Sequence, residues 1–253
     1  MIDQDALMTE AASPAEDSAV IQKHGLFAPR RPGPREQAAI ATRIKLVLAA
    51  ETLFGEKGVD AVSLREIAGT AGQLNSNATQ YHFGDKETLI QAIFEYRGRQ
   101  FEPARLAMLE RLEEEGRLLD VRGLMQVLCL PYLSARSAAG RYSYAAFLSQ
   151  YLTKLGSAGI THPFSQGDIA PAYNRLFSLL KQRLNYLPPN LAVRRAGMAS
   201  LSFCGMLIRW ESTREGYATL TLRQLVLDTL EQITAAVGAP AAYEGSYVFP
   251  IEA

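Results

Sequence analysis

The chain has 253 residues, which is enough for two domains of ordinary size. Hydrophobic residues make up 48% of the chain and charged residues 21%, a balance that supports a buried core and excludes disorder along the whole length. The 26 basic and 26 acidic residues cancel, which argues against a packaging protein that coats any nucleic acid through a high and even positive charge.

The cysteines and histidines indicate no redox or metal chemistry. Cys129 and Cys204 are isolated in apolar helical surroundings, where a buried thiol is commoner than a redox switch. The three histidines, at positions 24, 82 and 162, lack metal-ligand spacing, so we expect no metal and no other cofactor. The N-terminus lacks the order of a signal peptide, and the longest uncharged runs, such as residues 196–208, are too short to span a bilayer. We therefore expect a cytoplasmic protein without a membrane role.

Residues 1–35 are rich in proline and are expected to form a flexible arm. Residues 1–22 carry five acidic and no basic side chains, whereas residues 23–99 carry eleven basic and eight acidic ones, so positive charge is concentrated after the acidic stretch. The basic segment 30–35 lies just ahead of the first predicted helix. Two interpretations stay open: an arm that reaches into a DNA minor groove, or a linker with solubilising charges.

A first helix is predicted over residues 36–57, because apolar side chains recur there at helical spacing and Gly58 follows. Ser63 and Glu66 form the pattern of a capping box, which predicts a second helix that begins at Leu64 and ends near Gly72. This second helix is expected to last about two turns.

Asn75 is a candidate cap for a further helix over residues 76–82, which holds few large aliphatic side chains and many short polar ones. Asp85 is a candidate cap for the next helix, which has a strong apolar face and is expected to extend to about Arg99. Two short helices across a glycine-bearing turn, followed by a third, are typical of a helix-turn-helix that reads DNA.

The order and spacing of these residues, over about positions 38–97, resemble the DNA-binding domain of the TetR family of bacterial transcriptional regulators. The matching segments are Thr42-Arg43-Ile44, Ala49-Ala50, Leu53-Phe54, Glu56-Lys57-Gly58, Ser63-Leu64-Arg65-Glu66-Ile67-Ala68, Ala71-Gly72 and Tyr81-His82-Phe83-Gly84-Asp85-Lys86-Glu87. The chain departs from the family pattern at Gln73-Leu74, which adds a residue before the cap and can shift which side chains face bases.

The resemblance implies two sets of DNA contacts. Side chains of the recognition helix would contact bases, since amides can pair with adenine and a threonine methyl can touch thymine. The candidates are Ser76, Asn77, Thr79 and Gln80, and the cap residue Asn75 is also expected to belong to the DNA-binding site. Other polar side chains would contact the sugar-phosphate backbone. These candidates are Thr42, Arg43, Ser63, Arg65, Tyr81, His82 and Lys86. Alternatively, Thr42 is an ordinary surface residue and Arg43 pairs with a nearby acid.

Beyond residue 97 the apolar content rises and no alternation of the kind that marks strands persists, so the whole chain is predicted to be all-α. Pro103 is expected to start a separate helix over residues 104–115, because proline is tolerated in a first turn. Pro131 is expected to bend or split the following helix. Helices are expected at about residues 120–137, 139–155, 168–185, 190–214 and 221–237. The predicted domains are 36–97 for DNA binding and 98–238 for effector binding and dimerisation, with 239–253 as a tail.

In the family that the chain resembles, the C-terminal helices form a dimer interface and enclose a small-molecule cavity. We expect the last two helices to form the dimer surface, as a four-helix bundle shared by two subunits. The candidates are Gly197, Ala199, Ser200, Gly205, Leu222, Leu225, Val226, Thr229, Leu230, Ile233 and Val237. Alternatively, both helices cover the core of their own subunit. The cavity candidates are aromatic, flexible and amide side chains. They are Tyr144, Phe147, Gln150, Tyr151, Phe203, Met206, Leu207 and Trp210.

The sequence therefore predicts a regulator without enzymatic activity, most simply a repressor that binds a near-palindromic double-stranded DNA operator as a homodimer and is released by a small, apolar or aromatic effector. One alternative is a regulator of the same fold that is controlled without a small molecule. Another is a helical enzyme, but the sequence contains no Ser/His/Asp grouping, phosphate loop or HExxH motif.

Overall fold

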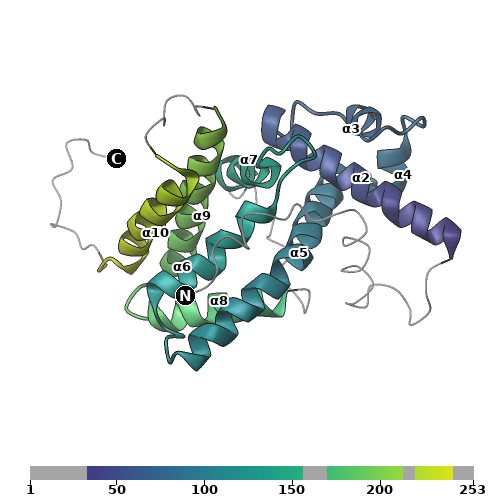
Figure 1. Ribbon diagram of the computed structural model, residues 1–253. Helices are drawn as coiled ribbons and strands as arrows, with labels where there is room; N and C mark the ends of the chain where they lie inside the picture. Colours follow the sequence, from purple (N-terminus) through teal and green to yellow (C-terminus); the bar gives the residue numbers. More distant parts are fainter. Residues whose placement is uncertain (1–32, 156–169, 213–219, 242–253) are drawn as a thin grey trace.

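The computed structural model describes residues 33–155, 170–212 and 220–241, and every element over these ranges is a helix. The all-α prediction is confirmed. The predicted arm and tail lie outside these residues, apart from 33–35 and 239–241. In Figure 1, α2, α3 and α4 lie together at one end of the molecule, and α5 leads from them to the remaining helices.

The N-terminal group contains three complete helices: α2 (Pro34–Lys57), α3 (Leu64–Thr70) and α4 (Ala78–Phe83). Proline at the first position of α2 costs no hydrogen bond, because that N–H would lack a helical partner in any case. Gly58 ends α2 with a φ of 84°, which glycine adopts at low cost, and its N–H donates to the carbonyl of Phe54. The apolar face of α2 is buried beneath α3 and α5.

Helix α5 (Lys86–Glu114) is continuous, which corrects the prediction of two helices divided at Pro103. Proline removes one internal hydrogen bond, but Pro103 is exposed, and buried residues on both sides of it hold the helix against the second group. Phe101 and Arg105 are two of these. The predicted domain boundary at residue 97 therefore falls within one helix.

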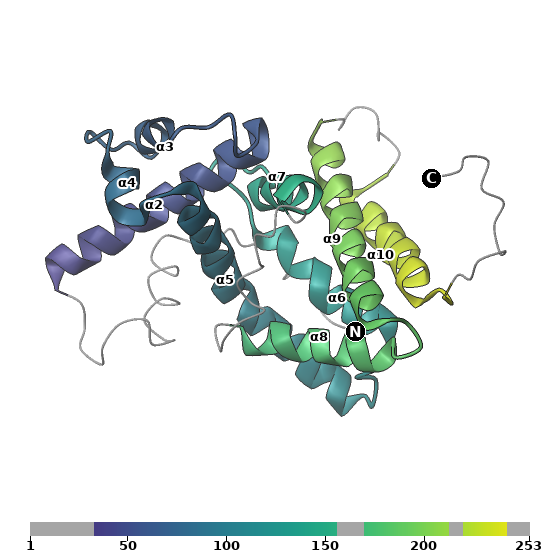
Figure 2. The ribbon, with the colours of Figure 1, turned by 180° about the vertical axis from the view of Figure 1, so that it is seen from behind.

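The second group contains α6 (Val121–Cys129), α7 (Ser143–Gln150), α8 (Pro171–Arg183), α9 (Pro189–Ser212) and α10 (Leu222–Gly238). The prediction for Pro131 is confirmed, because α6 stops at Cys129 and a 3₁₀ turn, η1 (Leu130–Ser134), follows. A π-helical turn, η2 (Tyr151–Leu155), continues α7. Figure 2 shows α9 and α10 side by side at the end remote from α4.

The two groups meet where α7 lies across α2. Gly55 permits this approach, because a Cβ atom at that position would lie 2.8 Å from Cβ of Ala146 and 2.9 Å from the backbone nitrogen of Phe147. A buried ion pair between Arg97 and Glu51 lies in the same region, with the Ser143 hydroxyl donating to Glu51. Helices α2, α5 and α7 are therefore joined by packing and by one polar cluster.

The apolar stripe of α10 packs within its own subunit. Its buried residues are Val226, Thr229, Leu230, Ile233 and Val237, and the helix contacts α9 and α6. Ala199 and Ser200 of α9 are also buried. These seven predicted dimer-surface residues instead cover the subunit's own core. The helical period of the sequence identifies a buried face but not the neighbour that buries it.

Helix α9 is the one described helix that is long and apolar enough to cross a membrane. The sequence prediction considered only uncharged runs, and α9 also contains arginines. The mostly buried core helices of soluble proteins pass the same test of length and composition, and α9 packs against α7, α8 and α10.

Candidate nucleic-acid interface

Helix α3 begins where its capping pattern predicts. The Ser63 hydroxyl accepts a hydrogen bond from the backbone N–H of Glu66 at 3.1 Å. The Glu66 carboxylate binds the Lys57 ammonium at 2.6 Å. That hydrogen bond is the main cause of a lowered pKa at Glu66, and the backbone of Ser63 acts in the same direction. Gly72 follows the helix with a φ of 70°, as expected for the residue that ends it.

The turn into α4 differs from the prediction. Asn75 caps a turn rather than the helix, because its Oδ1 accepts from the N–H of Asn77 at 3.0 Å. The N–H of Ala78 donates to the carbonyl of Asn75, and the helix begins at Ala78 with Asn77 at its cap position. Two residues predicted to be helical, Ser76 and Asn77, therefore lie in the turn. Their side chains are exposed.

The phase of α4 is set by its buried residues, which are Ala78, Thr79 and Phe83. Thr79 is 0% exposed and its hydroxyl makes no hydrogen bond. The Thr79 side chain therefore faces the core, whereas the sequence predicts that it contacts a base. Gln80 is exposed, and Tyr81 is 84% exposed. These two side chains point away from the packed face.

Arg43 of α2 holds the C-terminal end of α4. Its Nη1 donates to the carbonyl of His82 at 2.7 Å, and its guanidinium lies 4.4 Å from the centre of the Phe83 ring. The alternative in which Arg43 pairs with an acid is not what the structure shows. Partial burial lowers the pKa of His82, and the charge of Arg43 lowers it further. His82 is therefore neutral at pH 7 and can donate one ring N–H.

Lys86 is placed by the loop after α2. Its ammonium donates to the carbonyl of Val59 at 2.8 Å and to that of Asp60 at 3.4 Å. Asp85 caps α5 as predicted, since its side chain accepts from the N–H of Thr88 at 2.8 Å. Lys86 thus fixes the start of α5, next to the end of α4. Of the remaining backbone-contact candidates, Ser63 and Arg65 are exposed and Thr42 is partly buried.

Leu74 was not among the predicted contacts. It lies in the turn before α4 and is fully exposed, although leucine is usually buried. It belongs to the pair Gln73-Leu74 that lengthens this turn. An apolar side chain at this position can touch a thymine methyl group. The added residue in the sequence was the signal that could have identified it.

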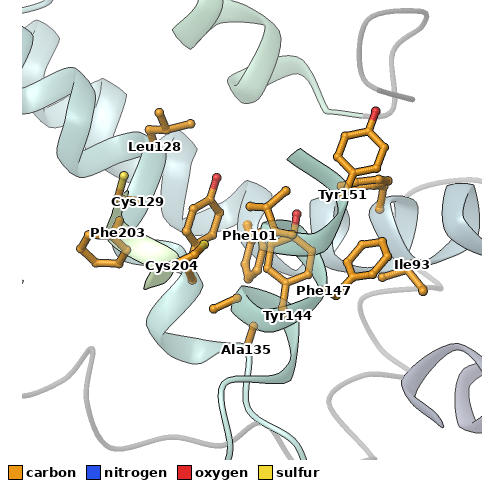
Figure 3. Close-up of a cluster of buried hydrophobic side chains, with 14 of the residues drawn as sticks. Ile93, Phe101, Leu128, Cys129, Ala135, Tyr144, Phe147, Tyr151, Phe203 and Cys204 are labelled. Atoms are coloured by element: carbon orange, nitrogen blue, oxygen red, sulfur yellow. The ribbon is translucent and has the colours of Figure 1, made fainter. Parts of the chain in front are cut away.

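The effector candidates do not form one site. Phe147 and Phe203 are fully buried, and Figure 3 shows them with Tyr144 and Phe101 in one cluster of packed side chains. Tyr151 joins the cluster through Phe94, with ring centres 4.7 Å apart. Leu207 is also buried, whereas Met206 and Trp210 are partly buried against the same core.

Gln150 lies apart from the aromatic cluster. It borders a surface pocket of about 240 Å³ between the end of α2 and η2. The other residues that line this pocket are Lys57, Gly58, Val59, Asp60, Ala61 and Lys154. The structure therefore separates the predicted amide from the predicted aromatic lining.

Residues 46–93 match the family model of the bacterial regulatory proteins of the tetR family. No curated protein matches the chain. Similar solved structures include a protein assigned to the TetR-family transcriptional regulators from Mesorhizobium loti, at 20% identity over 79% of this chain and 94% of that chain, with a TM-score of 0.41. They also include a TetR-family regulator from Streptomyces coelicolor A3, at 21% identity over 84% and 100%, with a TM-score of 0.36. A gamma-butyrolactone receptor matches at 21% identity over 79% and 98%, with a TM-score of 0.41.

The family assignment rests on residues 46–93, which contain the capped α3, the turn and the whole of α4. These elements have the order and packing of a helix-turn-helix, in which a second short helix presents its outer edge to DNA. Residues 46–93 therefore form a DNA-binding domain of the kind found in the tetR family of bacterial regulatory proteins.

Proposed function

We propose that this protein is a ligand-responsive repressor, which acts in the cytoplasm and binds a near-palindromic operator as a homodimer. The observation that supports the proposal is that α4 and its turn have one buried face and one exposed face. Thr79 and Phe83 are buried, whereas Gln80 and Tyr81 are exposed. A helix with one face packed against its own domain and a polar, exposed edge can enter the major groove of DNA.

The exposed edge contains the chemistry needed to read bases. The amides of Gln80 and Asn77 can pair bidentately with adenine, and Ser76 can bond to several bases. Tyr81, the neutral His82, Arg65 and Ser63 are proposed phosphate contacts, together with Thr42 and the remaining N–H groups of Arg43 and Lys86. The phosphate contacts would fix the position of α4 on the duplex, and the amides of Gln80 and Asn77 would provide sequence specificity.

Replacing Gln80 by alanine is expected to weaken binding to the preferred duplex by about 1–3 kcal/mol and to relax one base position. The reason is the loss of a bidentate contact to one base pair. Fluorescence anisotropy with the preferred duplex and with single-base variants of it would measure both effects.

Thr79→Val is the matched control, because it changes the neighbouring side chain on the buried face. It should leave base preference unchanged. If Thr79→Val relaxes base preference and Gln80→Ala does not, the proposed phase of α4 is wrong.

The proposed dimer uses the outer faces of α9 and α10, not the stripe that packs internally. Met198 is 54% exposed, and Val193 and Leu227 are also exposed hydrophobic residues. Gly205 is exposed on the same helix as Met198, and a Cβ at that position would meet nothing within 4 Å. Exposed apolar and small side chains together permit close approach by a second copy.

Met198→Glu is expected to shift the protein from dimer to monomer, because the association would bury an unpaired charge. Sedimentation velocity at micromolar concentration would measure the change, and Leu227→Glu should act in the same direction. Leu106→Glu serves as the control, since Leu106 is an exposed leucine of α5. A dimer that survives both α9 and α10 substitutions would contradict this interface.

In a dimer, the two helix-turn-helix domains can be arranged so that they fit the operator or so that they do not. An effector can release the operator only if it binds the second arrangement more tightly than the first. Helix α5 supports this coupling, because it starts beside α4 and continues into the second group of helices. We propose a small, mostly apolar effector that binds among the C-terminal helices, where the aromatic side chains are concentrated.

The alternative is a regulator of the same fold that is controlled without a small molecule. Titrating candidate compounds into the protein–operator complex separates the two. Release by at least one compound supports effector control, whereas release by none favours the alternative.

A further inference from the structure

Arg105 is a buried arginine that forms no ion pair with any residue in the described part of the chain. It is 1% exposed and belongs to α5, in the middle of the second group of helices. Its Nε and Nη1 atoms are buried and make no hydrogen bond. None of the ion pairs among the described residues includes it. Arg97 of the same helix, by contrast, binds Glu51 through two nitrogens.

The groups around Arg105 are mostly aromatic. Its guanidinium carbon lies 5.3 Å from the centre of the Phe101 ring and 5.0 Å from that of Tyr173. Its charge also acts on Tyr132, Tyr144 and Cys129. One acid, Glu102, lies nearby on α5, and its Oε1 accepts from the N–H of Ala172 at the start of α8.

The tyrosines and the cysteine around Arg105 do not neutralise its charge at pH 7. Burial raises the pKa of Tyr132, Tyr144 and Cys129, although the positive charge of Arg105 opposes that shift. Burial likewise raises the pKa of Tyr173 to about 12. The phenols and the thiol are therefore neutral, and the guanidinium faces an aromatic surface without a negative charge from these residues.

An arginine cannot relieve this situation by losing its proton, because a guanidinium stays charged in proteins. Burying an unpaired charge is costly, so a sequence that does so needs a compensating interaction. The planar guanidinium has a fork of N–H donors that matches a carboxylate, and the bidentate pair is stronger than a neutral hydrogen bond. The flanking rings supply the apolar contacts that the rest of such a ligand would need.

We propose that Arg105 binds the carboxylate of the effector, so that the effector is an amphipathic organic acid with an aromatic or acyl body. This inference rests on the proposed function as an effector-controlled regulator. The hydroxyls of Tyr132 and Ser200, which are 3.3 Å apart, supply further polar groups in the same core. Phe101, Tyr144 and Phe203, which Figure 3 shows in one buried cluster, would supply the apolar surface.

Two fluorescent probes that differ in one anionic group test the site. We expect the full-length protein to bind 8-anilinonaphthalene-1-sulfonate on the order of tenfold more tightly than its uncharged parent, N-phenyl-1-naphthylamine. Octanoate and phenylacetate should displace the sulfonate probe, and octanamide and phenylacetamide should not. Arg105→Met should abolish both preferences.

Arg111→Met is the matched control, because it removes a positive charge from the same helix at a partly exposed ion pair with Glu115. It should keep both preferences. Equal binding of the two probes by the wild-type protein, or a preference that survives Arg105→Met, would overturn the inference.

Thermal unfolding distinguishes a ligand-binding arginine from a structural one. In the absence of probe, Arg105→Met should melt no lower than the wild-type protein, because methionine removes an unpaired buried charge at similar volume. A fall of many degrees would show that the chain itself neutralises Arg105, and would overturn the proposal.

The DNA assay separates this inference from the proposed function. Release of the wild-type protein from its preferred duplex by amides as readily as by carboxylates would leave the regulator intact and refute the anionic site. Probe binding that depends on Arg105, in a protein without duplex preference, would refute the regulator and leave the site.

Discussion

Replacing Arg97 by leucine is expected to lower the free energy of unfolding by about 3–5 kcal/mol, because the carboxylate of Glu51 would remain buried without its partner. Arg97 donates to the two carboxylate oxygens of Glu51 at 2.6 and 2.7 Å. The Ser143 hydroxyl donates to Oε1 of the same carboxylate at 2.6 Å. Burial alone would lower the pKa of Arg97, but the carboxylate of Glu51 more than offsets this effect, so the pKa of Arg97 is raised.

Urea unfolding followed by circular dichroism would measure the loss. The double variant Glu51→Leu with Arg97→Leu is the control, because it removes both charges and should recover most of the stability. A single Arg97→Leu variant that loses less than about 1 kcal/mol would contradict the view that this pair is desolvated. The same cluster connects α2, α5 and α7, so the single variant should also weaken the coupling between effector and DNA.

Replacing Phe147 by alanine is expected to cost about 3–5 kcal/mol, the usual range for a fully buried phenylalanine. Phe147 is 0% exposed, and its ring centre lies 5.2 Å from that of Phe94. Its backbone nitrogen lies against the position that Gly55 leaves free of a side chain. The substitution would therefore open a cavity where α7 crosses α2.

The size of the loss decides between two roles for Phe147. A side chain that lines an open effector cavity has few packing partners on one side, and its truncation would cost less than about 1 kcal/mol. Phe177→Ala is the comparison, since Phe177 is a partly buried phenylalanine of α8 and should lose less than Phe147. Equal losses at the two positions would show that Phe147 is not a core residue of the α2–α7 contact.

Local signals in the sequence predicted the helix-turn-helix well. Ser63, Asp85 and Pro131 act through hydrogen bonds or steric effects within a few residues, so their consequences can be read without knowing the tertiary fold. The sequence predicts a start of α4 after Asn75, whereas the helix begins after Asn77. Asparagine is a good capping residue at either position, and only the turn geometry distinguishes them.

Features that depend on distant partners were not predictable in the same way. Pro103 is a strong local signal for a helix start, but packing on both sides of it keeps α5 continuous. The stripe of α10 would be apolar whether it packed against α9 or against a second subunit. The helical spacing of apolar residues therefore does not distinguish the two arrangements. The aromatic surroundings of Arg105 likewise follow from how several helices meet, not from its neighbours in the sequence.

If α4 and its turn read a specific DNA sequence, the full-length protein should select particular duplexes from a random pool, and sequencing of the bound duplexes would identify them. We expect enrichment of an inverted repeat whose half-sites are one helical turn or a multiple of it apart, and Gln80→Ala should relax one position in each half-site. A pool that stays random after repeated rounds, although the protein binds duplex DNA, would show that α4 and its turn do not read sequence.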